Sequence, residues 1–325
     1  SARVLAHLES VHPQPTLGVP QQAPLLMRRR SSAKVVKLLN EDAHFVELID
    51  KLPLPADYKG PTLEHGEAPT LADMKALLSL IKHTYGRAPS SVSKHVPVPQ
   101  TPAVPQSVAM RILLLAKSYL AQLPNMVEFK LEKGRVVIVG DTHGQLADFC
   151  WLLRSHGEPS TENVYVINGD IADRGPDACE ILILALGYMI AAPGAVYLNR
   201  GNHESLDMNV RTFGEGGGFS QEVGSKYDSA TFTLFQQLFN TLPIATRING
   251  EVLVVHGGLS RIRATPLEHM QQIDRRRRVP VGPSTDVDVL FFDFLWSDPR
   301  QTNGVATSGA RAATGIPRGP EPTRR

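Results

Sequence analysis

Three short polar clusters that contain glycine lie between residues 140 and 204, and each follows a run of apolar residues. The clusters are 140–144 (GDTHG), 169–175 (GDIADRG) and 200–204 (RGNHE). The apolar runs are 136–139, 164–167 and, with weaker character, 195–198. Such runs, bounded by glycine and acidic residues, predict buried strands that each deliver a loop at their carboxyl end. We therefore expect three loops to meet at one rim of the fold.

The spacing of the clusters favours an α/β fold. Residues 145–168 separate the first cluster from the second, and residues 176–200 the second from the third. Each interval has room for one crossover helix and a returning strand, which two neighbouring parallel strands need. A single GDxHG sequence would be a weak signal, because an aspartate after glycine is usually a turn residue or a helix cap. Three clusters in order at this spacing are a strong one.

The polar residues of these loops suit a pair of metal ions. Carboxylate and amide oxygens beside imidazole nitrogens are donors that Mn, Fe or Zn accept. The candidate ligands are Asp141, His143, Asp170, Asn202 and His256, the last of which follows a fourth apolar run. Asp170 is expected to bridge two divalent ions about 3.5–4 Å apart, a pair that generates hydroxide from water and clamps a phosphoryl group during in-line displacement.

Three residues of the clusters have predicted catalytic roles. Arg174 offers a fork of N–H groups that can hold phosphate oxygens, and Asn202 is expected to face the same phosphate. His203 lies beside the ligand Asn202 and is predicted to be the general acid that protonates the leaving group. Asp173 is the carboxylate expected to orient His203. The sequence thus predicts phosphoryl transfer to water.

The composition gives no sign of a nucleic acid or membrane partner. The net charge of the 325-residue chain is only +2 and its pI is about 8.5, so no strong overall field is expected. The apolar run 181–192 is too short to span a membrane and contains Gly187. The two cysteines, Cys150 and Cys179, fall in the expected crossover helices. They favour reduced thiols and an intracellular protein, cytoplasmic and/or nuclear.

The whole chain divides into four predicted parts. Residues 1–60 form a largely disordered or loosely helical extension, and 61–86 a short helical segment. Residues 87–106 form a proline-rich linker. Residues 107–325 form the catalytic domain, of which 300–325 are expected to be disordered.

Four elements outside the clusters are also predicted. The sequence TLAD at 70–73 is typical of a capping box and starts a helix that ends at Gly86. The expected apolar stripe of this helix is Leu71, Met74, Leu78 and Ile81. An amphipathic helix is expected between Ser107 and Pro124, and another helix over 231–239. The pair at 249–250, Asn-Gly, predicts a hairpin turn.

Taken together, these motifs resemble the metal-dependent serine/threonine protein phosphatases of the phosphoprotein phosphatase family. The matching segments are 140–145 (GDTHGQ), 168–175 (NGDIADRG), 200–205 (RGNHES), 242–260 (LPIATRINGEVLVVHGGLS) and 295–299 (LWSDP). The segments 107–124 and 207–209 (DMN) are most similar to the type 5 and EF-hand-containing branch. The resemblance implies a calcineurin-like metallophosphoesterase β-sandwich flanked by helices and a dinuclear metal centre. It also implies hydrolysis of phosphoserine and phosphothreonine by a hydroxide that bridges the two metals.

The chain departs from the family's pattern in two places. The segment 211–224 is longer and richer in glycine, which predicts a flexible flap near the substrate groove. After residue 299 the family continues with an Arg-Gly segment, a further histidine ligand and a tyrosine. Only Arg311 is a candidate counterpart, as a substrate-binding residue. The resemblance therefore implies a fold that is incomplete at its C-terminus, with one protein ligand fewer for the second metal.

Two other functions stay open. A broader metallophosphoesterase would act on nucleotides or phosphodiesters, although HGGL followed by LWSDP argues against it. A catalytically impaired phosphoprotein-binding or scaffold protein would follow from the absent half-site. For the main function, the expected partners are phosphoprotein substrates, and the sequence identifies no regulatory partner.

Overall fold

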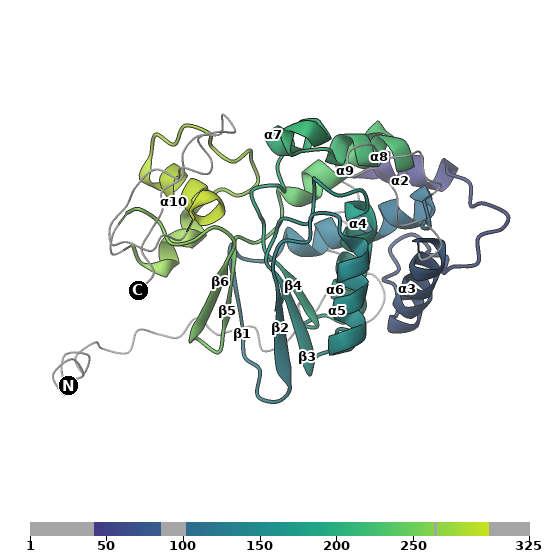
Figure 1. Ribbon diagram of the computed structural model, residues 1–325, viewed down its shortest axis with the longest axis horizontal. Helices are drawn as coiled ribbons and strands as arrows, with labels where there is room; N and C mark the ends of the chain where they lie inside the picture. The colour runs from purple at the N-terminus through teal and green to yellow at the C-terminus, as the bar shows by residue number, and fades with distance from the viewer. Residues whose placement is uncertain (1–41, 86–101, 263–264, 299–325) are drawn as a thin grey trace.

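The computed structural model describes residues 42–85, 102–262 and 265–298, and two small β-sheets lie at its centre (Figure 1). Three parallel strands form the first sheet in the order β2-β3-β4. They are β2 (Arg135–Val139), β3 (Asn163–Ile167) and β4 (Val196–Leu198), which match the predicted runs within one residue. The crossover helices between them are α5 (Leu146–His156) and α6 (Ala178–Ala191). The predicted βαβ units are therefore confirmed.

The second sheet joins segments that are far apart in the sequence, in the order β1-β5-β6. Strand β1 (Met126–Phe129) runs parallel to β5 (Ala245–Ile248), which is antiparallel to β6 (Val252–Val255). The turn between β5 and β6 is the predicted hairpin. Its residues Asn249 and Gly250 have φ values of 54° and 74°, the left-handed conformation that a type I′ turn requires at both positions.

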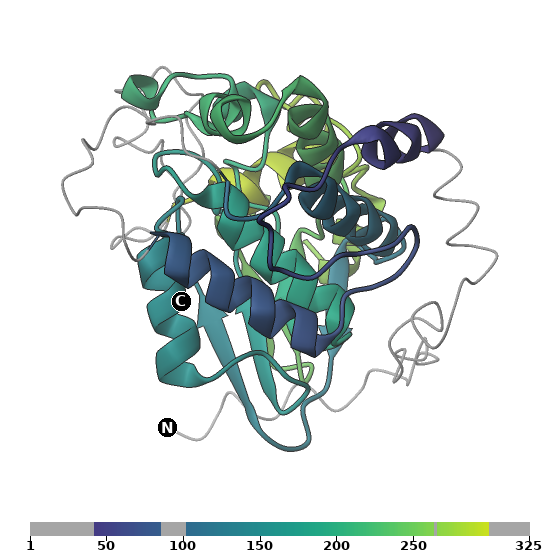
Figure 2. The same cartoon turned by 90° about the vertical axis from the view of Figure 1, so that its right-hand side faces the viewer.

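The two sheets pack face to face, and α5 and α6 lie against the outer face of the first sheet (Figures 1 and 2). The core between the sheets consists of Phe129, Val164, Val166, Ile248 and Val254. Tyr165 and Ile167 alternate with Val164 and Val166 along β3 and belong instead to the larger core on the helical side. Because β3 is buried on both faces, its sequence is continuously apolar. On the second sheet, helix α10 (Asp286–Trp296) provides the apolar cover.

The first two helices of the described residues are α2 (Ala43–Lys51) and α3 (Leu71–Tyr85). The predicted capping box of α3 is confirmed, because Thr70 N donates to Asp73 Oδ2 at 2.7 Å and Asp73 N donates to Thr70 Oγ1 at 3.2 Å. The predicted apolar stripe is buried at Met74, Leu78 and Ile81. Leu71, in the first position of the helix, is 40% exposed, and Leu77 is buried in the stripe in its place.

Both α2 and α3 contribute to the large apolar core that also holds α4 and α6. Helix α3 lies against α6, where Met74 occupies the space that a side chain at Gly187 would fill. The proposed division of the chain into extension, linker and catalytic domain stays a prediction. Residues 1–41, 86–101 and 299–325, and with them Gly86 and Arg311, lie outside the described residues.

Helix α4 (Gln106–Leu120) differs from the predicted amphipathic helix in two respects. It begins after Pro105, so that Ser107 lies inside the helix, and it ends before Pro124 is reached. It is also buried around most of its circumference, because α2, α6 and α9 pack against it from different sides. A helix surrounded by other helices loses the polar face that a surface helix keeps.

The segment predicted to be a flexible flap is instead ordered and packed. The segment 211–224 follows the short helix α7 (Leu206–Asn209), contains η2 (Phe213–Glu215) and ends within α8 (Phe219–Lys226). Phe219 is fully buried, and Gly217 lies so close to the carbonyl oxygens of Met208 and Arg211 that a Cβ would clash with them. Gly217 and Gly218 therefore permit close packing that a larger residue would prevent.

Helix α9 (Ser229–Phe239) follows α8 and contains the predicted helix 231–239. It starts two residues earlier because Asp228 caps it, accepting a hydrogen bond from Thr231 N at 2.8 Å. After β6, η3 (Leu267–Gln272) leads to buried Arg275, which donates to the carbonyl oxygens of Leu120 and Leu123. No helix in the described ranges is long and apolar enough to cross a membrane.

A buried cluster of charges ties α3, α6 and α8 together. Lys226 Nζ lies 2.6 Å from Glu180 Oε2, 3.1 Å from Glu222 Oε1 and 3.2 Å from Asp177 Oδ1. Tyr85, at the end of α3, donates to the other oxygen of Glu180 at 2.6 Å. Burial alone would lower the pKa of Lys226, but the charges of Glu222 and Glu180 outweigh it and hold that pKa well above its usual value.

Replacement of Lys226 by methionine should destabilise the fold by about 3–5 kcal/mol, because it leaves buried carboxylates without their cation. Urea unfolding measures this change. The exposed Lys75 of α3 provides the matched control, and Lys75→Met should change the free energy of unfolding by less than about 0.5 kcal/mol. Adding Glu222→Gln to Lys226→Met should recover part of the loss. Equal stability of Lys226→Met and Lys75→Met would contradict this account.

Candidate active site

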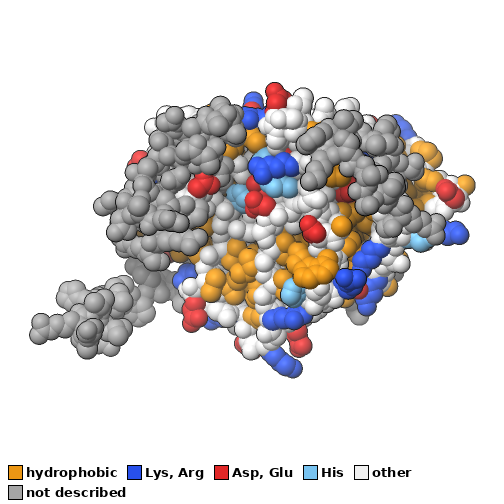
Figure 3. Space-filling model, viewed as in Figure 1, with side chains coloured by type: hydrophobic (Ala, Val, Ile, Leu, Met, Phe, Trp, Pro, Cys, Tyr) orange, Lys and Arg blue, Asp and Glu red, His pale blue; other side chains and the backbone are white. Residues whose placement is uncertain are grey.

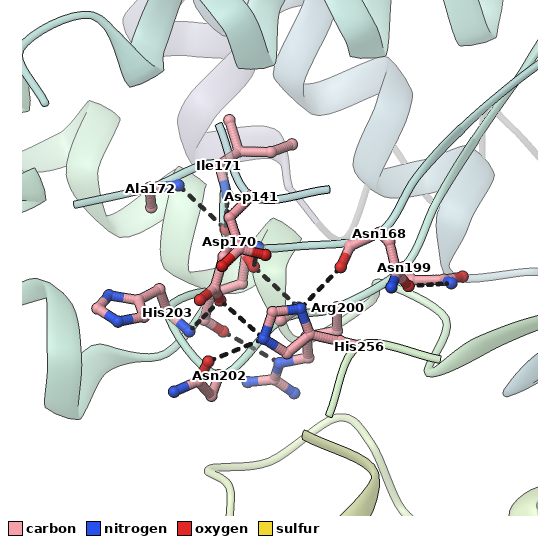
Figure 4. Close-up of polar contacts among 12 residues, drawn as sticks. Asp141, Asn168, Asp170, Ile171, Ala172, Asn199, Arg200, Asn202, His203 and His256 are labelled. Carbon is pink, nitrogen blue, oxygen red and sulfur yellow. Dashed lines mark hydrogen bonds and ion pairs between the residues drawn. The ribbon is translucent and has the colours of Figure 1, made fainter. Parts of the chain in front are cut away.

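The polar clusters meet at the carboxyl ends of the strands (Figure 4). His143 Nε2 lies 3.6 Å from Asp170 Oδ2 and 4.0 Å from Asp141 Oδ2. His256 Nε2 lies 3.3 Å from Asp170 Oδ1 and 2.9 Å from Asn202 Oδ1. The structure thus brings together all five residues that the sequence selects as metal ligands, with Asp170 between the two histidines.

The site is open to solvent on one side. Figure 3 shows histidine, acidic and basic side chains gathered on this face of the molecule. Asp141 and Arg174 are exposed, whereas Asp170, Asn202 and His203 are buried. A ligand that approaches from solvent would therefore meet the exposed carboxylate and guanidinium first.

The loops of the site contain backbone conformations that residues other than glycine rarely adopt. Among the described residues, five that are not glycine have positive φ, and four of them are in this site. They are His143 (40°), Asp170 (51°), Asp173 (71°) and Arg174 (65°). Such left-handed residues are uncommon outside glycine, and they persist where surrounding contacts hold them.

Glu204 supplies much of this restraint. It is fully buried, and its carboxylate accepts four backbone N–H groups. Oε2 accepts from Asp170 and Gly201, each at 2.8 Å, and Oε1 accepts from Ile171 at 2.9 Å and Ala172 at 3.1 Å. Burial raises the pKa of Glu204, and the N–H donors act in the opposite direction. One carboxylate thereby joins the second loop to the third.

Sequence reasoning assigned no role to Glu204, although it stands in the third cluster. In the sequence, Glu204 is a carboxylate next to Gly201, Asn202 and His203. A carboxylate in that position could equally be a metal ligand or a surface residue. Only the fold shows that its carboxylate accepts backbone N–H groups of two loops. The buried Arg200 was missed in the same way; its Nε donates to Glu204 O at 3.0 Å.

His256 is oriented by a polar connection between the two sheets. Its Nδ1 bonds to Asn168 O at 2.8 Å, and Asn168 Nδ2 donates to Val255 O at 3.0 Å. Asn199 Nδ2 donates to Asn168 Oδ1 at 2.9 Å. Since Nδ1 is committed to the backbone, the ring presents Nε2 to Asp170.

The two histidines differ in their electrostatics. Burial lowers the pKa of His143, and Asp170 opposes it without reversing it. Burial also lowers the pKa of His256, but the Asp170 charge and hydrogen bond outweigh it and raise that pKa to about 9. Asp170 itself, although buried, has a pKa below its usual value because His256 is so close. A metal would have to displace the proton of His256, since histidine ligates as the neutral ring.

The predicted pair of His203 and Asp173 is formed. His203 Nδ1 lies 2.8 Å from Asp173 Oδ2, and the two side chains are only 2% and 0% exposed to solvent. Arg174 Nη2 lies 3.1 Å from the opposite nitrogen, Nε2. Arginine can only donate, so we assign Nε2 as an acceptor and Nδ1 as the nitrogen that donates to Asp173. The imidazole rings of His143 and His203 meet edge to face, with their centroids 4.7 Å apart.

Comparison with known proteins identifies this arrangement. Residues 134–319 match the family model described as calcineurin-like phosphoesterase. The chain belongs to this family. The β-sandwich flanked by helices, which the resemblance implied, is thereby confirmed as a calcineurin-like phosphoesterase fold.

Individual members of the family are similar over most of the chain. Serine/threonine-protein phosphatase 5 of Rattus norvegicus is 32% identical over 295 residues, which are 87% of this chain and 53% of that protein. Serine/threonine-protein phosphatase rdgC of Drosophila melanogaster is 39% identical over 232 residues, 67% of this chain and 34% of that protein. The expected similarity to type 5 phosphatases is confirmed. The chain spans about half the length of the type 5 relative.

A solved structure agrees with the sequence relatives. It is a protein serine/threonine phosphatase from Saccharomyces cerevisiae with similarity to a human phosphatase. It superposes with a TM-score of 0.57 at 36% identity and covers 62% of each chain. The fold and the family are therefore supported by sequence and by structure.

The calcineurin-like phosphoesterase family implies divalent metals, and the residues of this chain fit them. Two sets of donor atoms, each within 4.8 Å of one another, could hold an ion: Asp141 with Asp170 and His256, and His143 with Asp170 and His203. Within the described residues, His143 Nε2 is buried and has no hydrogen-bond partner, while Nδ1 is held by Ala172 O at 2.8 Å. A buried nitrogen without a partner is costly, and a metal would satisfy it.

The second of these donor sets differs from the predicted one, since it includes His203. That residue already uses Nδ1 on Asp173 and Nε2 on Arg174. We therefore keep His203 outside the proposed ligand set. Arg311 lies outside the described residues, so its proposed place in the site stays a prediction.

Mn²⁺ should raise the melting temperature of the chain after treatment with a chelator, because it binds the folded state. At a concentration of 100 times Kd the stabilisation should be about 2.7 kcal/mol. Asp170→Asn removes the carboxylate shared by both donor sets and should abolish the shift. Asp148→Asn, an exposed change on α5, is the matched control and should keep it. A full shift in Asp170→Asn would refute the bridging role.

Proposed function

We propose that this chain is the catalytic part of a protein serine/threonine phosphatase that hydrolyses phosphoserine and phosphothreonine. The observation that carries the proposal is the buried His203–Asp173 pair placed directly against the cluster of metal donors. Relatives that bear the name serine/threonine-protein phosphatase support it. Phosphoproteins are the proposed partners, and an intracellular location, cytoplasmic and/or nuclear, stays a prediction.

We propose that two divalent ions, Mn, Fe and/or Zn, are held by Asp141, His143, Asp170, Asn202 and His256. When bound, such ions supply Lewis acidity toward the phosphate and a nucleophile derived from water. The hard oxygens of the carboxylates and the amide, mixed with imidazole nitrogen, support this choice of metals.

Arg174 is the proposed phosphate clamp. Its guanidinium is exposed at the rim and rests against His203 Nε2 at 3.1 Å. An incoming phosphate dianion is a stronger acceptor than an imidazole, so we expect Arg174 to turn toward it with charge-assisted hydrogen bonds. Asn202, whose Oδ1 lies 2.9 Å from His256, would add its amide N–H group.

The same movement prepares His203 for its proposed role. Once Arg174 donates to the phosphate, Nε2 is free to take up a proton from solvent while Nδ1 remains bound to Asp173. As an oxygen derived from water bonds to phosphorus, the P–O bond to serine or threonine breaks. Its electron pair stays on the serine or threonine oxygen, and the Nε2 proton passes to that oxygen. Asp173 stabilises the imidazolium that holds the proton until then.

The decisive substrate experiment compares three phosphates with the chelator-treated, Mn²⁺-loaded chain. A phosphoserine peptide should be hydrolysed faster, in kcat/KM, than a phosphotyrosine peptide or bis(p-nitrophenyl) phosphate. Preference for the diester would favour the broader metallophosphoesterase. Binding of the phosphoserine peptide without turnover would favour the phosphoprotein-binding protein.

His203→Asn should lower kcat for the phosphoserine peptide by about 10²–10⁴-fold, the usual contribution of a general acid. Metal content should stay the same, because His203 is not a proposed ligand. Plasma emission spectroscopy of the purified variant checks the metals, and steady-state kinetics check the rate. His156→Asn changes a histidine on α5 away from the proposed site and serves as the control. Full activity in His203→Asn would exclude it as the acid.

A further inference from the structure

Asn209 is the nearest polar neighbour of the His203–Asp173 pair that the proposed chemistry does not yet use. It is the last residue of the short helix α7 and is fully buried. Its Nδ2 donates to Asp173 Oδ2 at 2.9 Å and to His203 O at 2.7 Å. It therefore contacts both members of the pair, the carboxylate of one and the backbone of the other.

The orientation of the Asn209 amide is determined by its partners. Both acceptors of Nδ2 are oxygens, so a flipped amide would place Oδ1 against a carboxylate and a carbonyl. In the observed orientation, Oδ1 accepts instead from Gln236 Nε2 of helix α9 at 2.8 Å. Three hydrogen bonds without access to water allow only one position for this side chain.

Asp173 is consequently held on every side. Oδ1 accepts from Phe219 N at 3.0 Å, and Oδ2 accepts from both His203 and Asn209. Without Asn209, the carboxylate of Asp173 could rotate about its Cβ–Cγ bond, and His203 Nδ1 would follow Oδ2. The hydrogen bond from Asn209 that fixes the Asp173 carboxylate therefore also fixes the direction of His203 Nε2.

We propose that Asn209 is a positioning residue for the general acid, and that Gln236 holds it in place. The inference rests on the proposed phosphatase function of His203. Asn209 touches neither the phosphate nor the metal donors, so it acts only through Asp173 and His203. Its loss should leave substrate binding intact and impair the transfer of the proton to the leaving oxygen.

Rates on two substrates with different leaving groups distinguish this positioning role from a general contribution to stability. A serine alkoxide is a poor leaving group and needs the proton, whereas p-nitrophenolate leaves readily without one. Loss of general acid catalysis therefore slows the phosphoserine peptide much more than p-nitrophenyl phosphate. A variant that is merely less well folded loses active enzyme, and both rates fall by the same factor.

The experiment measures kcat and KM of the Mn²⁺-loaded chain on both substrates. Asn209→Ala should lower kcat on the phosphoserine peptide by about 10- to 100-fold, less than complete loss of the acid, with KM changed less than about threefold. On p-nitrophenyl phosphate the fall should be at most about threefold. Joined to His203→Asn, Asn209→Ala should cause no additional loss on the peptide, because the two residues act as one unit.

Gln236→Ala is the second, milder variant. Gln236 is only half-buried on α9, so the fold should tolerate the change, and the peptide rate should fall selectively by a smaller factor. Its neighbour Gln237 provides the matched control, because Gln237 Oε1 accepts from Lys117 and has no contact with the pair. Gln237→Ala should leave both rates unchanged.

The outcomes separate the inference from the function on which it rests. A wild-type chain that does not hydrolyse the phosphoserine peptide would overturn the proposed function. If the wild-type chain is active but Asn209→Ala and Gln236→Ala slow both substrates equally, or slow neither, the positioning role is wrong. Additive losses in the double variant with His203→Asn would also refute it.

Discussion

The arrangement of the site depends on one buried carboxylate, that of Glu204. A charge removed from water must be compensated, and here four backbone N–H groups from two loops do so. Those groups converge only if Asp170 adopts its left-handed conformation and Gly201 lies directly beside it, where a Cβ would touch Asp170. The strain in the second loop and the glycine in the third are two consequences of the same interaction.

Asp173, which orients the proposed acid His203, is also held by contacts from several segments. Asp173 faces His203 on one side, Asn209 of α7 on a second and Phe219 of α8 on a third. Helix α8 is in turn fastened through Lys226 to α6 and, by way of Glu180, to Tyr85 of α3. Helices α3, α6, α7 and α8 thus support the site through a series of polar contacts, although none of them supplies a proposed metal ligand.

Much of the fold could be predicted from local sequence because each element carries its own signal. The apolar runs before the clusters predicted β2, β3 and β4, the TLAD sequence predicted the start of α3, and Asn249-Gly250 predicted the hairpin. The errors occurred where a neighbour decided the outcome. The helix starting at Gln106 was expected to be amphipathic and is buried because other helices surround it. Gly217 and Gly218 permit close packing in the segment where a flap was expected.

The sequence by itself determined the family, the βαβ order and the residues that gather at the strand ends, because parallel strands place their carboxyl ends at one rim whatever surrounds them. Only the tertiary structure decided which side chains point into that rim. Glu204 stands in the same cluster as Asn202 and His203, and Asn209 follows shortly after it, yet both turn toward backbone and carboxylate partners contributed by distant segments. The direction of a side chain within a loop depends on those partners, and a linear spacing of residues does not contain them.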